Sequence, residues 1–107
     1  MELAITFRIL REHGACAPRY RHLARALGGV RAYGKDTPIP LLRAFEINGW
    51  EDTFWVLERY AVLPECVPAV RGLLDKYSVW VFERGHKYAL DHSTAKLHEL
   101  FSATAQN

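Results

Sequence analysis

The chain has 107 residues, of which 50% are hydrophobic, 12% aromatic and 24% charged. These proportions are typical of a folded domain, and they exclude a disordered chain. The length suits one domain, so we expect a single helical domain over residues 1–107. The net charge is +2, but residues 1–50 carry eight Lys/Arg and four Asp/Glu, whereas residues 51–107 carry six and eight. The first half is therefore basic and the second mildly acidic.

Membrane insertion and secretion are not indicated by the sequence. No apolar run approaches the roughly 18 residues that a membrane-spanning helix needs. Met1 is followed at once by Glu2, so no basic region and apolar segment form a signal peptide. The two cysteines, Cys16 and Cys66, form no CxxC pair and no disulfide framework. We therefore expect a cytoplasmic protein without a membrane partner.

The first segment, residues 2–14 (ELAITFRILREHG), combines two periodicities. Leu3, Phe7 and Leu10 have helical spacing, and Gly14 follows as a helix C-cap. Leu3, Ile5, Phe7 and Ile9 also alternate, as in a strand. No partner strand is evident elsewhere, so we favour a helix.

The second segment predicts a helix that starts near Pro18 and ends at Gly28-Gly29. Tyr20, Leu23, Ala24 and Leu27 follow the i, i+3, i+4, i+7 rule and are expected to face inward. Residues 30–40 (VRAYGKDTPIP) have no period and predict an ordered loop.

Two further helices are predicted on either side of Asn48-Gly49. The first begins after Pro40, with Leu41, Leu42 and Phe45 inward. The second is expected to run to Pro64, with a buried stripe of Trp50, Phe54, Leu57 and Ala61. The flanks are helical rather than alternating, so we interpret Asn-Gly as a corner between helices and not as a hairpin turn.

A long helix is expected over residues 67–89, with Val70, Leu74, Tyr77, Val81 and Tyr88 on its buried side. Gly85 falls on that stripe, and a glycine inside a helix costs about 1 kcal/mol relative to alanine. Either another helix approaches closely there, or the helix breaks at Arg84-Gly85.

Asp91 or Ser93 is predicted to cap a last helix, with Leu97, Leu100 and Phe101 inward. The fold class is therefore all-α, a compact single-domain bundle or orthogonal array of about five to six helices without a strand.

Chemistry-bearing residues do not assemble into a recognisable site. His86, His92 and His98 are six residues apart, which places successive side chains about 120° apart on a helix. No histidine pair has the i, i+4 spacing of a zinc helix. Cys16 lies near His13 and His22 in the sequence, but no acid or amide that would orient a Cys–His pair is evident. We predict no catalytic residue, no metal and no cofactor, and therefore no enzyme.

The stretch RYRHLARALGGVRAYGK, residues 19–35, is basic and contains no acid. With Tyr20, Leu23 and Leu27 facing inward, Arg21 and Arg25 should project together from the outer side of the helix. Such a surface suits an acidic protein patch, a phosphate backbone or stacked bases, and the alternative is a solvated face. The candidate partner-binding residues are Arg19, Arg21, Arg25, Arg31, Tyr33 and Lys35.

Residues 9–29 (ILREHGACAPRYRHLARALGG) resemble the first two helices of winged-helix regulators, with the LARALG run as the basis. In those proteins a recognition helix follows. Here GVRAYGKDTPIP follows, and its glycine and prolines are unsuited to such a helix. The resemblance implies nucleic-acid binding as an alternative function.

A second resemblance covers most of residues 15–100. LARALGGVRAYGKDTPIP, DTPIPLLRAFEINGWEDTFWVLERY and YSVWVFERGHKYALD are similar to small uncharacterised helical proteins of bacterial, phage and prophage origin. That group has no known activity, so no catalytic residue is carried over. The resemblance implies a mobile-element setting, in which small folded proteins often bind and block a host protein, defence complexes included.

From these features we expect a small non-enzymatic binding protein. It would act as a phage-encoded inhibitor of a host or defence complex, in the manner of an anti-CRISPR protein. Its basic surface would contact a protein partner with an acidic surface. A nucleic-acid-binding protein and a homo-oligomeric structural module remain the alternatives.

Overall fold

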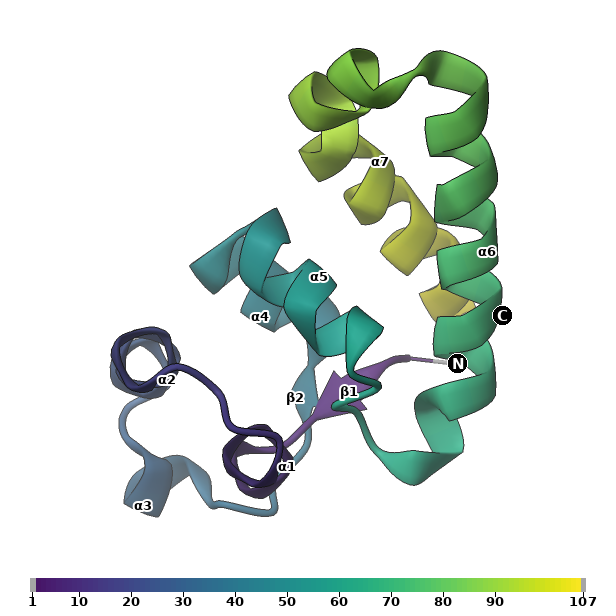
Figure 1. The fold of residues 1–107 in the computed structure, drawn as a ribbon. Coiled ribbons are helices and arrows are strands. Elements are labelled where there is room, and N and C mark those ends of the chain that lie inside the picture. Colours follow the sequence, from purple (N-terminus) through teal and green to yellow (C-terminus); the bar gives the residue numbers. More distant parts are fainter. Residues whose placement is uncertain (1, 107) are drawn as a thin grey trace.

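The fold is built almost entirely of helices (Figure 1). The computed structural model describes residues 2–106, and the predicted all-α class is confirmed over that range. In chain order the elements are β1 (Ala4–Ile5), α1 (Phe7–Glu12), α2 (Ala17–Ala26), α3 (Val30–Tyr33), β2 (Ile39–Pro40), α4 (Leu41–Asn48), α5 (Trp50–Glu58), a 3-10 turn (Pro64–Cys66), α6 (Val67–Arg84) and α7 (His86–Gln106).

The helices form three groups along the longest dimension of the molecule. Helices α1, α2 and α3 lie at one end, α4 and α5 in the middle, and the antiparallel pair α6 and α7 at the other end (Figure 1). The principal extents are 43 × 27 × 22 Å. Helix α2 and helix α6 therefore occupy opposite ends, so surfaces on their outer sides are far apart.

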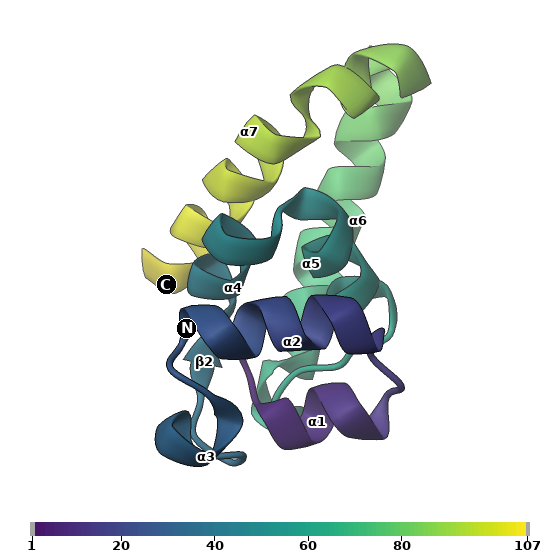
Figure 2. The same ribbon diagram turned by 90° about the vertical axis from the view of Figure 1, so that its left-hand side faces the viewer.

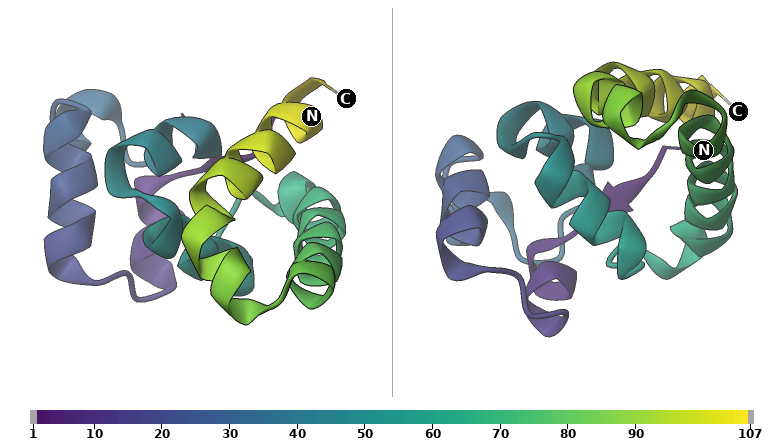
Figure 3. Two further views of the ribbon diagram at one scale, coloured as in Figure 1. Left: turned by 90° about the horizontal axis from the view of Figure 1, so that it is seen from above. Right: turned by 45° about the horizontal axis from the view of Figure 1, so that its top comes forward.

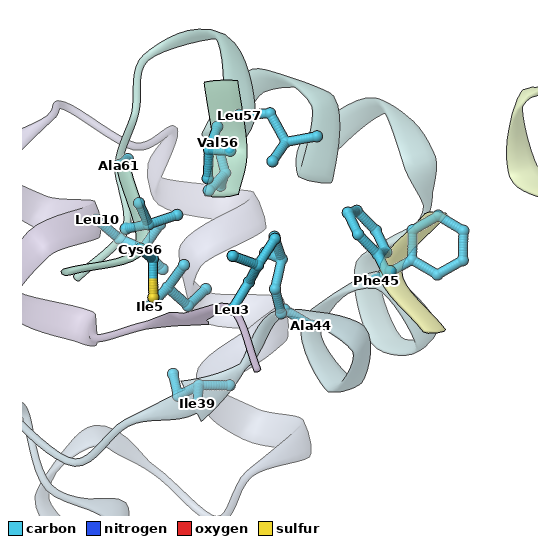
Figure 4. Close-up of a cluster of buried hydrophobic side chains, with 14 of the residues drawn as sticks. Leu3, Ile5, Leu10, Ile39, Ala44, Phe45, Val56, Leu57, Ala61 and Cys66 are labelled. Atoms are coloured by element: carbon cyan, nitrogen blue, oxygen red, sulfur yellow. The ribbon is translucent and has the colours of Figure 1, made fainter. Parts of the chain in front are cut away.

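The core lies where the N-terminal strand passes between these groups. Ile5, Ile39 and Leu57 are almost completely buried there, and Leu3, Val56 and Cys66 surround them (Figure 4). Burying aliphatic side chains of this size contributes about 1.5–3 kcal/mol each. The core thus joins β1, β2 and α5, which are distant in sequence.

The first segment is partly strand and partly helix, so the expected continuous helix over residues 2–14 is wrong. Ile5 pairs antiparallel with Ile39, and Ala4 pairs with Pro40. The side chain of Thr6 then caps α1 by accepting a hydrogen bond from the Ile9 amide at 3.1 Å. The partner strand was hidden in the sequence because prolines flank Ile39, and proline is rare inside strands.

The predicted loop over residues 30–40 contains both a four-residue helix, α3, and the strand β2. The expectation of a fold without any strand is therefore also wrong, although the two strands span only two residues each. The helix predicted to start near Pro18 and to end at Gly28-Gly29 is confirmed as α2, with Leu23 and Ala24 buried and Tyr20 and Leu27 partly buried.

Helix α5 ends at Glu58 rather than near Pro64, because Tyr60 adopts the left-handed conformation with φ 52°. The Ala61 amide donates to the Val56 carbonyl at 2.9 Å, and the Tyr60 amide donates to the Leu57 carbonyl at 3.1 Å. These two bonds form a Schellman motif, which usually has glycine at the position of Tyr60. The sequence therefore contained no ordinary stop signal at this point.

The expected long helix over residues 67–89 is wrong, and the break at Arg84-Gly85 is confirmed. Gly85 has φ 92°, and its amide donates to the Val81 carbonyl at 2.8 Å at the end of α6. Helix α7 begins directly after it, so neither Asp91 nor Ser93 caps the last helix. Ser93 is instead buried within α7, while Leu97, Leu100 and Phe101 face inward as predicted.

Candidate basic surface

Helix α2 lies at the surface of the molecule (Figure 2) and carries two arginines on its solvent side. Arg21 and Arg25 are both exposed, and with Gly28 and Gly29 they line one shallow depression. The opposite side of α2 is anchored in the core through Leu23 and through Tyr20, whose ring meets Phe7 edge to face at 5.4 Å. This anchoring directs the two guanidinium groups toward the same outer surface.

Arg19 has a different role from its two neighbours. Its Nε donates to Asp52 Oδ2 at 2.7 Å, and its Nη2 donates to the Asn48 carbonyl at 3.1 Å. The Asn48 side-chain amide returns a hydrogen bond to the Arg19 carbonyl at 3.2 Å. Arg19 therefore connects α2 to the corner between α4 and α5, and its charge is not available to a partner.

Tyr33 is also engaged within the fold. Its hydroxyl donates to the Pro38 carbonyl at 2.9 Å, and its ring meets Phe7 edge to face at 5.9 Å. The ring is partly buried, so it contributes to packing rather than offering a free face for stacking. The hydroxyl bond also holds the segment that leads into β2.

The charge of Lys35 lies beside an internal ion pair. Arg8 donates from Nη2 to Asp36 Oδ2 at 3.0 Å and also bonds through Nε, in a bidentate arrangement. This hydrogen bonding to Arg8 lowers the pKa of Asp36, and the charge of Lys35 favours the same direction. Lys35 therefore neighbours a carboxylate of its own chain.

Four of the six predicted residues are exposed and form no ion pair within residues 2–106. Because Lys35 lies beside Asp36, we define the basic face as the other three residues, Arg21, Arg25 and Arg31. Arg31 lies on α3, which follows the end of α2 after Gly28 and Gly29. The C-terminal end of α2 carries a partial negative charge that attracts Arg25, but it offsets only about half a unit charge.

The histidines and cysteines are dispersed over the described part of the chain. His92 stacks on Tyr88 with ring centroids 3.9 Å apart, and its Nδ1 lies 2.9 Å from the Tyr88 carbonyl. Cys16 is exposed and Cys66 is buried, and both are free thiols. Between residues 2 and 106, no three His, Cys, Asp or Glu side chains form a group that could hold a metal ion.

A pocket of about 320 Å³ lies between α2 and the α4–α5 corner. Its floor is apolar, with Leu10, Leu23 and Val56, and the Arg19–Asp52 pair lines it as well. Asn48 also lines it, and the Oδ1 atom of Asn48 is buried without a hydrogen-bond partner. This size is at the lower end for ligand pockets, so the pocket suits a small apolar molecule with one hydrogen-bond donor.

A second exposed feature, which was not predicted from the sequence, lies on the outer side of α6. Phe82 is 89% exposed and Val79 is 56% exposed. Large apolar side chains at such exposure, when adjacent, are typical of interaction surfaces. The sequence did indicate their exposure. At 100° per residue, Val79 and Phe82 lie on the opposite side of the helix from the predicted buried residues Val70, Tyr77 and Val81.

Comparison with known proteins found no family model, no curated protein and no solved structure that matches this chain. Among the described residues, no helix is both long and apolar enough to cross a membrane.

Proposed function

We propose that this chain is a non-enzymatic binding protein that docks onto an acidic surface of a protein partner through the basic face. The observation that supports the proposal is the pairing of Arg21 and Arg25 along one depression. Within residues 2–106 neither has a carboxylate partner, whereas nearby Arg8 and Arg19 are neutralised by Asp36 and Asp52. Two like charges at i, i+4 destabilise a helix slightly, so an external acid would relieve their repulsion.

The biological setting of the proposal comes from the resemblance to small phage and prophage proteins. A small protein of this kind would act as an inhibitor that occupies an acidic surface of a host or defence complex, as an anti-CRISPR protein does. Guanidinium groups recognise carboxylates by paired hydrogen bonds, so the target surface would carry Asp or Glu side chains.

Nucleic-acid binding is the second candidate, because phosphates also attract arginines. Three cations would release at most about three counterions, so the logarithm of affinity would fall with a slope of about −3 against the logarithm of salt concentration. By comparison, a protein that makes about 6–10 phosphate contacts loses about 10³–10⁵ in affinity between 50 and 200 mM salt. The small number of unpaired cations on the basic face therefore favours a protein partner.

The test is a capture experiment from nuclease-treated lysate of a bacterial host that carries related prophages. The double variant Arg21→Glu/Arg25→Glu is compared with Arg84→Glu/Lys87→Glu, which changes the net charge equally at exposed sites on α6 and α7. We expect the first variant to lose an acidic protein that the wild type and the control retain. Retention of the same protein by both variants would refute the role of the basic face.

An electrophoretic shift assay separates the two candidates. With DNA and RNA at low salt, we expect no shifted band at concentrations that capture the protein partner. A shift that disappears in Arg21→Glu/Arg25→Glu and weakens steeply with salt would replace the protein partner with a nucleic acid.

A further inference from the structure

The outer side of α6 is an unpartnered helix face at the edge of the molecule. In Figures 1 and 3 no other element of the described residues 2–106 lies beyond α6 on this side. The buried side of the helix carries Val70, Leu73 and Tyr77. The exposed side carries five residues at alternating intervals of four and three: Pro68, Gly72, Asp75, Val79 and Phe82.

Alternating intervals of four and three keep residues on one seam along a helix, as in a coiled coil. In coiled coils, each side chain of the seam inserts into a hole on a neighbouring helix. Helix α6 already packs against α7 with its other side. The outer seam is therefore a second contact surface that the fold itself does not use.

Gly72 and Phe82 have complementary shapes on this seam. Gly72 has helical backbone, and a Cβ atom added there would meet nothing within 4 Å, so no contact inside the molecule requires a glycine. Phe82 is the most exposed large hydrophobic side chain among the described residues, at 89%. The two lie ten residues apart, about 15 Å along the axis, so they cannot meet within one copy.

When two copies of α6 pair antiparallel, Phe82 of each copy meets Gly72 of the other, so the contact forms twice. A twofold axis near Tyr77 places Phe82 of each copy over Gly72 of the other, where the missing side chain leaves room for the ring. The same register places Val79 opposite Asp75, and it brings Lys76 on the flank of the seam within reach of Glu83 of the other copy. A protein with a twofold contact needs only one self-complementary patch.

We propose that the outer face of α6 is a homodimer interface, formed by an antiparallel pair of α6 helices in which Phe82 packs on Gly72 of the second copy. The charges favour this occupant. The exposed charged residues along the face are Arg71, Asp75, Lys76 and Glu83, two of each sign. A membrane or nucleic acid would require an excess of positive charge, whereas balanced signs are complementary to a second copy.

This inference does not rest on the proposed function, because α6 and the basic face lie at opposite ends of the molecule. The dimer leaves both basic faces open. The contact uses one helix from each copy, so it falls below the about 1,200–2,000 Å² of a standard interface. We therefore expect reversible association with a dissociation constant on the order of 100 µM.

Sedimentation velocity on the full chain, from about 10 µM to about 1 mM, measures the association. Phe82→Ser is expected to weaken it at least tenfold. Gly72→Ala is expected to weaken it as well, because the added methyl group fills the space for the ring. The matched control is Leu90→Ser, which removes an exposed apolar side chain from α7, and it should leave the association unchanged.

Gly72→Ala also distinguishes loss of the interface from loss of the fold. Alanine is the better helix former, so the melting temperature of dilute monomer should rise while dimerisation falls. A variant that simply misfolds would lower both. Melting of dilute Phe82→Ser provides the second check, since an 89% exposed ring contributes little to the monomer.

Charge exchange tests the second copy directly. Each of the variants Lys76→Glu and Glu83→Lys should be monomeric alone, because residues 76 and 83 of the two copies would then carry the same charge and repel each other. An equimolar mixture of the two variants should associate, since opposite signs face each other again. A monomer at about 1 mM would overturn the proposal, and so would association that survives Phe82→Ser and Gly72→Ala. Binding of Phe82 to anionic vesicles by a monomeric chain would likewise replace the second copy with a lipid surface.

Discussion

The Tyr77 hydroxyl lies 2.8 Å from the Ser93 hydroxyl oxygen and joins α6 to α7 at their buried contact. Ser93 donates its only hydroxyl proton to the Ala89 carbonyl, so Tyr77 is the donor in the bond between the two helices. Ser93 is 1% exposed and Tyr77 is 9% exposed. Water therefore cannot replace either partner readily.

Ser93→Ala should destabilise the protein by about 1–3 kcal/mol, because it leaves the buried Tyr77 hydroxyl without an acceptor. Tyr77→Phe should cost less, about 1 kcal/mol, because Ser93 keeps its bond to Ala89. Urea unfolding of the two single variants and the double variant measures both values and their coupling. Equal stability of Ser93→Ala and wild type would show that this bond is not formed in solution.

Gly72 within α6 and Gly85 directly after it should respond to alanine with changes in stability of opposite sign. At Gly85, φ 92° is a left-handed conformation that an L-residue adopts at a cost of about 1–2 kcal/mol, so Gly85→Ala should be destabilising. At Gly72 the backbone is helical and the space is open, so Gly72→Ala should stabilise the dilute monomer by about 1 kcal/mol. Thermal unfolding at low micromolar concentration measures both. If both substitutions changed the stability in the same direction, the helix break at Gly85 between α6 and α7 would be contradicted.

Thr6→Val should destabilise α1 by about 1 kcal/mol, because valine keeps the shape of threonine but cannot accept the Ile9 amide hydrogen. The Thr6 side chain is buried, so an isosteric change tests the cap rather than the packing. Hydrogen exchange at Ile9 should accelerate. Thr6→Ser retains the oxygen and serves as the control, and equally fast exchange in both variants would argue against the cap.

The Asp36 carboxyl should titrate below its ordinary range, because hydrogen bonding to Arg8 lowers its pKa. A carboxylate with a lowered folded pKa stabilises the native state above its unfolded pKa, and this stabilisation is lost as the pH falls through the folded value. An NMR titration of Asp36 should therefore shift to higher pH in Arg8→Met. An unchanged midpoint would mean that the two side chains are not paired in solution. Lys35→Met is the control, with a smaller upward shift.

Much of the helical framework was predictable because its signals are local. Leu23 and Ala24 are buried as the period of α2 predicts, and Gly28 ends that helix. The Asn48-Gly49 corner and the inward-facing Leu97 follow from the same kind of evidence. Each of these features depends on residues within one or two turns of the position.

The candidate site was only partly predictable. The outward direction of Arg21 and Arg25 follows from the helix period, but Arg19 lies on the same helix and bonds Asp52, 33 residues away. The hydrogen bond of Tyr33 to Pro38 and its ring contact with Phe7 likewise could not be predicted from the sequence. A list of basic residues therefore overestimates the free charge of a surface.

By itself, the sequence determined the class of the fold, the position of most helices and the basic character of the first half. Hydrophobic period and glycine stops act over a few residues, so they are present before the chain folds. The tertiary structure alone decided that Ile5 pairs with Ile39, that Tyr60 ends α5 and that Arg19 is neutralised. The strand pair and the Arg19 ion pair need partners that are distant in sequence. The strained backbone of Tyr60 is offset by burial that exists only when distant segments pack together.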